Sequence, residues 1–178
     1  KEESGYLFAL FSGALAGGVL PEILKIGAIQ NGKILRRNLE NLVFYPMFWG
    51  GQAVMVDAFY RLQAFWFGDR AEVTTILKKV LVDQLVYTPL LALPTGLLAV
   101  TWWENDRSGS AVREVFSVRG LREKAFPSLV ANLAVWLPAV SLVYAIPARL
   151  QVPVYAVALS FWVLLFTWIN AGPSTRRS

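Results

Sequence analysis

Apolar residues dominate five stretches of the chain, and short polar segments separate these stretches. They cover residues 6–28, 41–67, 75–103, 126–147 and 151–171. A helix needs about 20 apolar residues to cross the roughly 30 Å hydrocarbon core of a bilayer. Lone strands cannot satisfy their backbone hydrogen bonds in lipid. The pattern therefore predicts an all-α protein, a multi-pass transmembrane helical bundle of four to five membrane helices, in a single domain, 1–178.

The longest polar segment, residues 104–124, lies between the third and fourth stretches. Within it, residues 110–119 place Val115 and Phe116 on one face of a helix, with charged side chains elsewhere, and Gly120 would end that helix. This pattern predicts a short basic amphipathic helix on the membrane surface. A solvated loop is the alternative interpretation.

Composition supports the membrane interpretation and excludes several kinds of catalytic and metal-binding site. Hydrophobic residues make up 56% of the chain and charged residues only 16%, which is too apolar for an ordinary soluble domain. The net charge of +5 comes from basic residues in the short polar segments, so membrane topology explains it better than nucleic-acid binding. The chain has no Cys and no His, which removes thiol nucleophiles, imidazole bases and the common zinc ligands. We expect no metal, no cofactor and no enzymatic activity.

The distribution of Lys and Arg predicts an orientation. Most of them lie after the first stretch, after the third stretch and at the C-terminus. Cytoplasmic loops carry the excess of positive charge in multi-pass proteins. With five spans, the N-terminus is expected outside and the C-terminus inside, with residues 30–40 and 104–124 on the same side.

Polar residues inside the third stretch are the first candidates for a functional site. Lys79 and Asp83 are four residues apart, so on a helix they share one face and are able to pair. Gln84 follows directly, and Pro89 removes a backbone donor five residues later. An ionisable residue in a membrane helix is costly in lipid and is expected to face protein or water. The alternative is that Asp83 caps or pairs locally near the membrane interface.

The second stretch carries a similar pair, Asp57 and Arg61, again four residues apart. Neighbouring helices joined by short loops usually pack together, so both pairs are predicted to form one polar cluster. This cluster either lines a pore or only ties the bundle together. The candidate pore or cluster residues are Asp57, Arg61, Lys79, Asp83, Gln84 and Arg149.

Small residues and prolines predict how the helices pack and bend. Ala9, Gly13 and Gly17 repeat every four residues, which lets a neighbouring helix approach closely; a flexible, Gly-rich helix without a special partner is the alternative. Helix kinks are predicted at Pro46, Pro89, Pro94 and Pro147.

Several of these residues also fit a family pattern. Lys79, Asp83, Gln84 and Pro89 follow the order Lys-x-x-x-Asp-Gln-x-x-x-x-Pro, and Phe59-Tyr60 stands where a Trp-Tyr pair is usual. The C-terminal half adds Asn132, Trp136, Pro147 and Trp162. With these residues the chain resembles the Mpv-seventeen and twenty-two-kilodalton peroxisomal membrane protein family over nearly its whole length.

The chain departs from the family pattern at three places. Val143-Tyr144 replaces the usual Asn-Phe, Arg149 follows Pro147 by two residues rather than four, and Asp57 stands where His is frequent. These departures indicate a divergent member, and a bacterial branch is one interpretation. Organelle assignments therefore carry over poorly.

The resemblance implies a small multi-pass protein that forms a pore or maintains membrane and metabolite balance. We expect a small-solute or ion channel, and the alternative is a structural or assembly subunit of a membrane complex. The expected partners are the lipid bilayer and either a larger membrane complex or further copies of the chain. The expected location is a mitochondrial inner, peroxisomal or plastid membrane in a eukaryote, or the inner membrane in a bacterium. A water-filled path to Asp83 would favour the pore, and a dry, fully paired Asp83 the structural role.

Overall fold

The computed structural model describes residues 2–170, with the side chains of all except 2–4, 28–29, 148 and 166–170. Over these residues the chain is entirely helical apart from turns and connections, which agrees with the predicted all-α class. Five long helical stretches follow one another in sequence. They are α1 (Glu2–Gly13) with α2 (Leu20–Leu24); α3 (Arg36–Phe67); α4 (Val73–Val82) with α5 (Leu93–Glu104); α7 (Val118–Gly120) with α8 (Phe126–Ala145); and α9 (Ala148–Asn170). The short helix α6 (Gly109–Val115) precedes α7.

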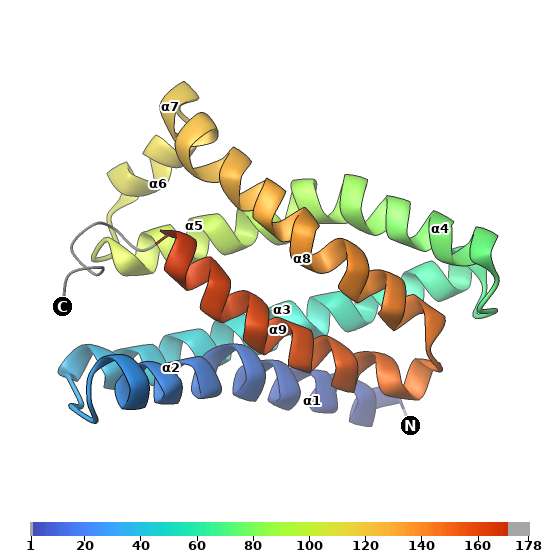
Figure 1. Ribbon diagram of the computed structural model, residues 1–178, viewed down its shortest axis with the longest axis horizontal. Helices are drawn as coiled ribbons and strands as arrows, with labels where there is room; N and C mark the ends of the chain where they lie inside the picture. Colours follow the sequence, from blue (N-terminus) through green and yellow to red (C-terminus); the bar gives the residue numbers. More distant parts are fainter. Residues whose placement is uncertain (1, 171–178) are drawn as a thin grey trace.

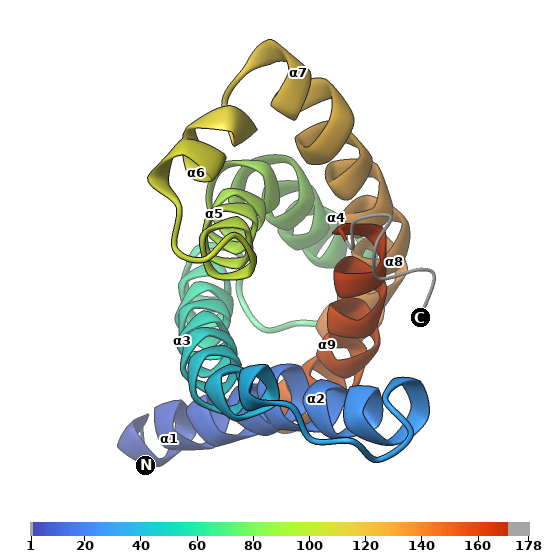
Figure 2. The ribbon, with the colours of Figure 1, turned by 90° about the vertical axis from the view of Figure 1, so that its left-hand side faces the viewer.

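Consecutive long stretches run antiparallel to each other and form a bundle (Figure 1). The first stretch packs against α3, α4 packs against α8, α8 against α9, and α9 returns to the first stretch. Viewed from one end, the stretches therefore surround a common centre (Figure 2). The basic segments 30–40 and 104–124 lie at the same end of this bundle (Figure 1), where Arg37 donates a hydrogen bond to the carbonyl of Trp103.

Three helical stretches of the described chain are long and apolar enough to cross a membrane: Gly5–Gly27, Val73–Glu104 and Val118–Ala145. The described apolar part of α9, Arg149–Leu165, is shorter, and residue 171 of the predicted last span lies outside the described residues. α3 contains the predicted span 41–67 but is not among the three. Its buried polar side chains include Asn38, Asn41, Gln52, Asp57 and Gln63. The structure thus describes a helical protein with three candidate membrane helices.

Apolar side chains face outward from this bundle and polar side chains are buried inside it, as in a protein surrounded by lipid. Large apolar side chains face outward on several helices; Phe11, Leu90 and Val157 are 69%, 73% and 74% exposed. Polar and charged side chains are buried, including two carboxyl groups, those of Glu22 and Asp83, at 4% exposure. Water-soluble monomers rarely expose large apolar patches and rarely bury charges. A surrounding hydrocarbon solvent explains both features.

The predicted packing residues of the first stretch face α3. A Cβ atom added to Gly13 would lie 2.3 Å from the Cβ of Ala53, and one added to Gly17 would lie 2.6 Å from the Trp49 ring. Ala9, one turn before Gly13, is fully buried. Helices approach this closely only where side chains are absent or small.

Helix boundaries differ from the prediction at two places. α3 begins at Arg36 rather than near Asn41, because the side chain of Asn38 accepts a hydrogen bond of 2.6 Å from the backbone N–H of Leu35. Gly120 does not end a helix; it belongs to α7, and α6 ends at Val115. A Cβ at Gly120 would lie 2.0 Å from the carbonyl oxygen of Glu114, so glycine lets α7 turn tightly against α6.

Four segments of the described chain are π-helical: Ala14–Val19, Lys25–Ile29, Asp83–Ala92 and Leu121–Ala125. Three of them end two residues before a proline, which is Pro21, Pro94 or Pro127. A proline ring clashes with the carbonyl four residues earlier in an α-helix. The wider π turn gives the ring room, so the helix continues through the proline.

The four prolines predicted as kinks occupy different positions. Pro46 lies within the continuous helix α3, Pro89 within the π-helical segment, Pro94 at the start of α5, and Pro147 in the break between α8 and α9. Pro147 thus separates two helices, whereas the other three lie in continuous helical stretches.

Candidate functional site

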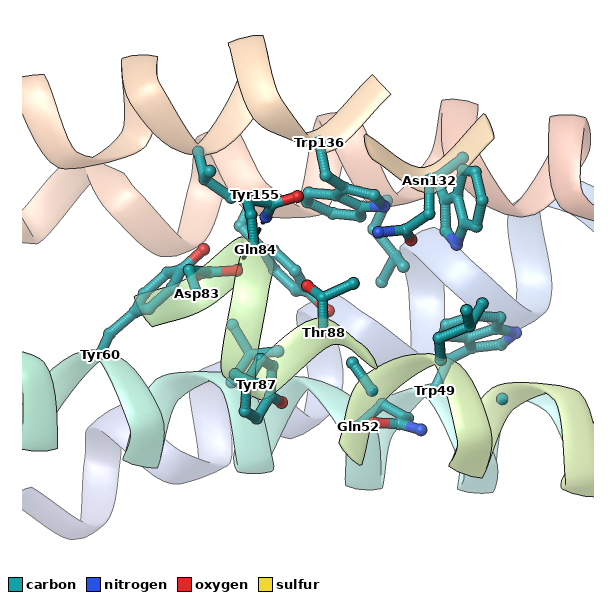
Figure 3. Close-up of a pocket in the computed structure, with 17 residues that line it drawn as sticks. Trp49, Gln52, Tyr60, Asp83, Gln84, Tyr87, Thr88, Asn132, Trp136 and Tyr155 are labelled. Atoms are coloured by element: carbon teal, nitrogen blue, oxygen red, sulfur yellow. Dashed lines mark hydrogen bonds between the residues drawn. The ribbon is translucent and has the colours of Figure 1, made fainter. Parts of the chain in front are cut away.

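A cavity of about 70 Å³ lies in the centre of the bundle, between α3, the third stretch, α8 and α9 (Figure 3). Five polar side chains contribute to its lining, and all are buried: Gln52, Asp83, Gln84, Thr88 and Asn132. Aromatic rings form much of the remaining wall. A cavity of this size and polarity has room for a few water molecules or one small solute. We call it the Asp83 cavity.

Asp83 is held at the edge of this cavity by neutral hydrogen-bond donors. The Tyr144 hydroxyl donates to Oδ2 over 2.7 Å, and the Gln84 amide donates to Oδ1 over 2.9 Å. The Tyr144 hydroxyl in turn accepts a hydrogen bond of 2.8 Å from the Gln63 amide. The chain of bonds therefore joins α3, α8 and the third stretch around one carboxyl group.

The predicted ion pair between Lys79 and Asp83 is wrong. The Lys79 ammonium lies 3.8 Å from Oδ1 of Asp69, in the connection before α4, and 5.7 Å from the centre of the Tyr144 ring. The backbone N–H of Asp83 still bonds to the Lys79 carbonyl, so the α-helical spacing holds between the two residues, but their side chains bind different partners. Lys79 is thus bound to the neighbouring loop, and Asp83 faces the cavity.

Asp57 and Arg61 do pair, at 2.9 Å, but they do not join Asp83 in one cluster. The Arg61 guanidinium lies over the Tyr6 ring at 4.5 Å, so this pair belongs to the contact between α3 and α1. Neither residue lines the Asp83 cavity. The prediction of a single cluster between the second and third helices is therefore wrong.

Arg149 also lies away from the cavity. It is exposed at the beginning of α9 and makes no ion pair with another described residue. Of the six residues predicted for a pore or polar cluster, Asp83 and Gln84 line the Asp83 cavity.

A second buried polar cluster was not predicted from the sequence. Glu22 accepts hydrogen bonds from the amides of Asn38 and Asn41 at 2.6 and 3.1 Å, and lies 3.6 Å from the Lys25 ammonium. The Trp103 indole donates to the Asn41 carbonyl oxygen over 2.7 Å. We call this group the Glu22 cluster. The available signal was the three-residue spacing of Asn38 and Asn41, which puts both amides on one face of α3.

The Asp83 cavity contains polar atoms that lack partners. Among the described residues, Gln84 Oε1, the Tyr87 hydroxyl and Trp49 Nε1 are buried without any hydrogen-bond partner, and all three residues line the cavity. Buried polar atoms in native proteins are nearly always satisfied, if not by protein then by water or a ligand. Unsatisfied donors and acceptors around one cavity indicate that it holds something polar.

A second pocket of about 330 Å³ lies between α5, α6 and the start of α8, and its lining is entirely apolar. A site that selects a solute needs a few placed polar groups. Only the Asp83 cavity of these two combines space with such groups.

The fold and the cavity together define a class: a helical candidate membrane protein with a buried, polar central cavity. Comparison with models of known protein families, with curated proteins and with solved structures gives no match. The resemblance drawn from the sequence pattern therefore stays a prediction.

Proposed function

We propose that this chain is a multi-pass membrane protein whose five helical stretches form a path for small polar solutes or ions, with the Asp83 cavity as its solute-binding site. The observation that carries the proposal is the cavity itself, which joins a carboxyl group, three amides and unsatisfied polar atoms in the centre of the bundle. Ionisable residues inside membrane bundles usually mark solute or ion pathways.

In this proposal α3 and α9 complete the bundle beside the three apolar stretches. α3 is shielded from lipid along its polar face by the helices around it, and its buried amides bond within the protein rather than to lipid. α3 is then able to count among four to five membrane helices despite its lower hydropathy, because its polar positions point inward. The family that the chain resembles fits the same role.

Reconstitution tests this function directly. The purified chain in liposomes should release small entrapped solutes or conduct in a planar bilayer, and Asn132→Leu, which fills part of the cavity with apolar volume, should reduce this activity. Asp57→Asn, outside the cavity, should leave it unchanged. Equal activity of wild type and Asn132→Leu, or no activity in either assay, contradicts the proposal.

A structural role in a membrane complex is the second candidate, and one observation favours it. Both oxygens of Asp83 accept hydrogen bonds, and the bonds of Tyr144 with Gln63 and Asp83 join three helices. In that role the polar groups only stabilise the bundle. The chain would then co-purify with a stable partner complex and show no solute flux when reconstituted alone.

A further inference from the structure

The charge of Asp83 has no counter-charge within the described chain. Its two oxygens bond to the neutral donors Tyr144 and Gln84, and no ion pair between described residues includes it. Lys79, one helical turn earlier, pairs with Asp69 instead. A buried ion without an opposite charge is costly. A cation bound in the cavity would provide that charge.

The cavity wall indicates which kind of cation fits. Its aromatic residues come from α3, the third stretch, α8 and α9, and they are Trp49, Tyr60, Tyr87, Trp136, Tyr155 and Trp162. The ring centres of Trp136 and Tyr155 lie 5.4 Å apart and those of Tyr60 and Tyr155 lie 6.4 Å apart, which makes a continuous aromatic surface near Asp83 (Figure 3). Aromatic faces attract organic cations, whereas Ca²⁺ and Mg²⁺ require about six or more oxygen ligands. One carboxyl group, with four neutral polar side chains and six aromatic residues, therefore favours an organic ammonium ion.

Two of the three unsatisfied polar atoms are able to accept hydrogen bonds from the N–H groups of such a cation, whereas Trp49 Nε1 is a donor only. Gln84 Oε1 is an acceptor, and the Tyr87 hydroxyl oxygen is able to accept as well. Both residues are on the same helical segment as Asp83: Gln84 follows it directly, and Tyr87 is four residues later. The volume of about 70 Å³ limits the ligand to a few heavy atoms.

We propose that the Asp83 cavity binds a small organic ammonium cation, with Asp83 as its counter-ion and the surrounding aromatic rings as its cage. This inference rests on the proposed function, because the same cavity is taken as the solute site. It goes further by naming the chemical class of the solute.

Calorimetric titration of the purified full chain in detergent micelles tests the binding. Methylammonium chloride is the probe, and sodium chloride at the same ionic strength is the control. Saturable binding of methylammonium that sodium does not reproduce is the expected result. Absence of saturable methylammonium binding, or equal binding of sodium, overturns the proposal.

Variants test the two parts of the site. Asp83→Asn should weaken methylammonium binding by about tenfold or more, because the charge is lost while the shape is kept. Tyr155→Leu should weaken it by roughly threefold to tenfold, and Tyr155→Phe should bind within about twofold of wild type, because the ring face remains. Asp57→Asn is the matched control, a buried Asp outside the cavity, and should bind like wild type. Unchanged binding by Asp83→Asn overturns the proposal.

Two further readouts keep the test decisive. If Asp83→Asn does not fold, as judged by circular dichroism and gel filtration, the comparison of Tyr155→Leu with Tyr155→Phe decides, and equal affinities of these two variants refute the cage. Solute release from liposomes, measured separately, distinguishes the two proposals. Methylammonium binding without solute release supports the ligand class and contradicts a transport role. Solute release without methylammonium binding supports a transport role and contradicts the ligand class.

Discussion

Glu22 and Asp83 are equally buried carboxyl groups in the same bundle, yet their surroundings differ. Glu22 has a cationic neighbour, Lys25, and two amide donors, and it does not line either of the two pockets described above. Asp83 has only neutral donors and adjoins a cavity with unsatisfied polar atoms. A charge that the protein itself satisfies stabilises the fold, whereas one left open beside a cavity is available to a ligand. The three predictions below test this difference.

The largest expected effect is on stability after loss of the Glu22 carboxyl group. Glu22→Ala removes the acceptor of two buried amides, those of Asn38 and Asn41, and each orphaned buried donor costs about 1–3 kcal/mol. We therefore expect the free energy of unfolding to fall by about 3 kcal/mol. Asp83→Ala should cost only about 1 kcal/mol, because water in the adjoining cavity is able to satisfy the released donors.

Equilibrium unfolding of both variants in detergent micelles measures these losses. A loss for Asp83→Ala as large as that for Glu22→Ala would show that both carboxyl groups are structural, and the contrast between the two regions would disappear.

The second prediction compares two buried asparagines. Asn41→Leu breaks the bonds between Trp103, Asn41 and Glu22 and should destabilise the protein by about 2 kcal/mol. Asn132→Leu lies in the cavity wall, where no hydrogen bond between described residues depends on it, and should change stability by less than about 1 kcal/mol. Thermal unfolding followed by circular dichroism checks both. A larger loss for Asn132→Leu than for Asn41→Leu would contradict the assignment of the cavity as the less structural region.

The smallest expected effect concerns Lys79. In a double-mutant cycle, Lys79→Met and Asp69→Asn should couple by about 0.5 kcal/mol, because Asp69 is largely exposed and the pair is screened. The cycle of Lys79→Met with Asp83→Asn should give a coupling energy near zero. The measurement is the free energy of unfolding of the single and double variants. Strong coupling between Lys79 and Asp83 would contradict this expectation and support the ion pair that the sequence spacing predicts.

The sequence predicts the helical class and the close packing of the first helix well, because both depend on local properties. Apolar length locates the long helices. Gly68, with φ of +82°, caps the end of α3, a position where glycine tolerates the left-handed region. The approach of the first helix to α3 follows from the absence of side chains at Gly13 and Gly17.

The candidate site was predicted only in part, because its geometry depends on distant residues. Asp83 and Gln84 were noticeable as polar residues in an apolar stretch. The hydroxyl group that bonds to Asp83, however, belongs to Tyr144, 61 residues later in the sequence. The expected Lys79–Asp83 pair rested on the α-helical spacing, which the structure keeps, but Lys79 pairs with Asp69 and Asp83 bonds to Tyr144, and neither partner follows from that spacing. Glu22 was not among the predicted site residues, because its partners on α3 are 16 and 19 residues away.

The π-helical segment Asp83–Ala92 has a consequence for how related chains could vary in length. Deletion of one residue in an α-helix turns everything that follows by about 100°, but a π-helical turn holds about one residue more than an α-helical turn, so this segment is able to lose a residue and tighten while the following helix stays nearly in register. A chain that tightened this segment into an α-helix would keep the lipid-facing length almost unchanged, yet it would present a different set of side chains to the centre. A single-residue deletion here would therefore change which side chains line the Asp83 cavity while the flanking helices stay in place.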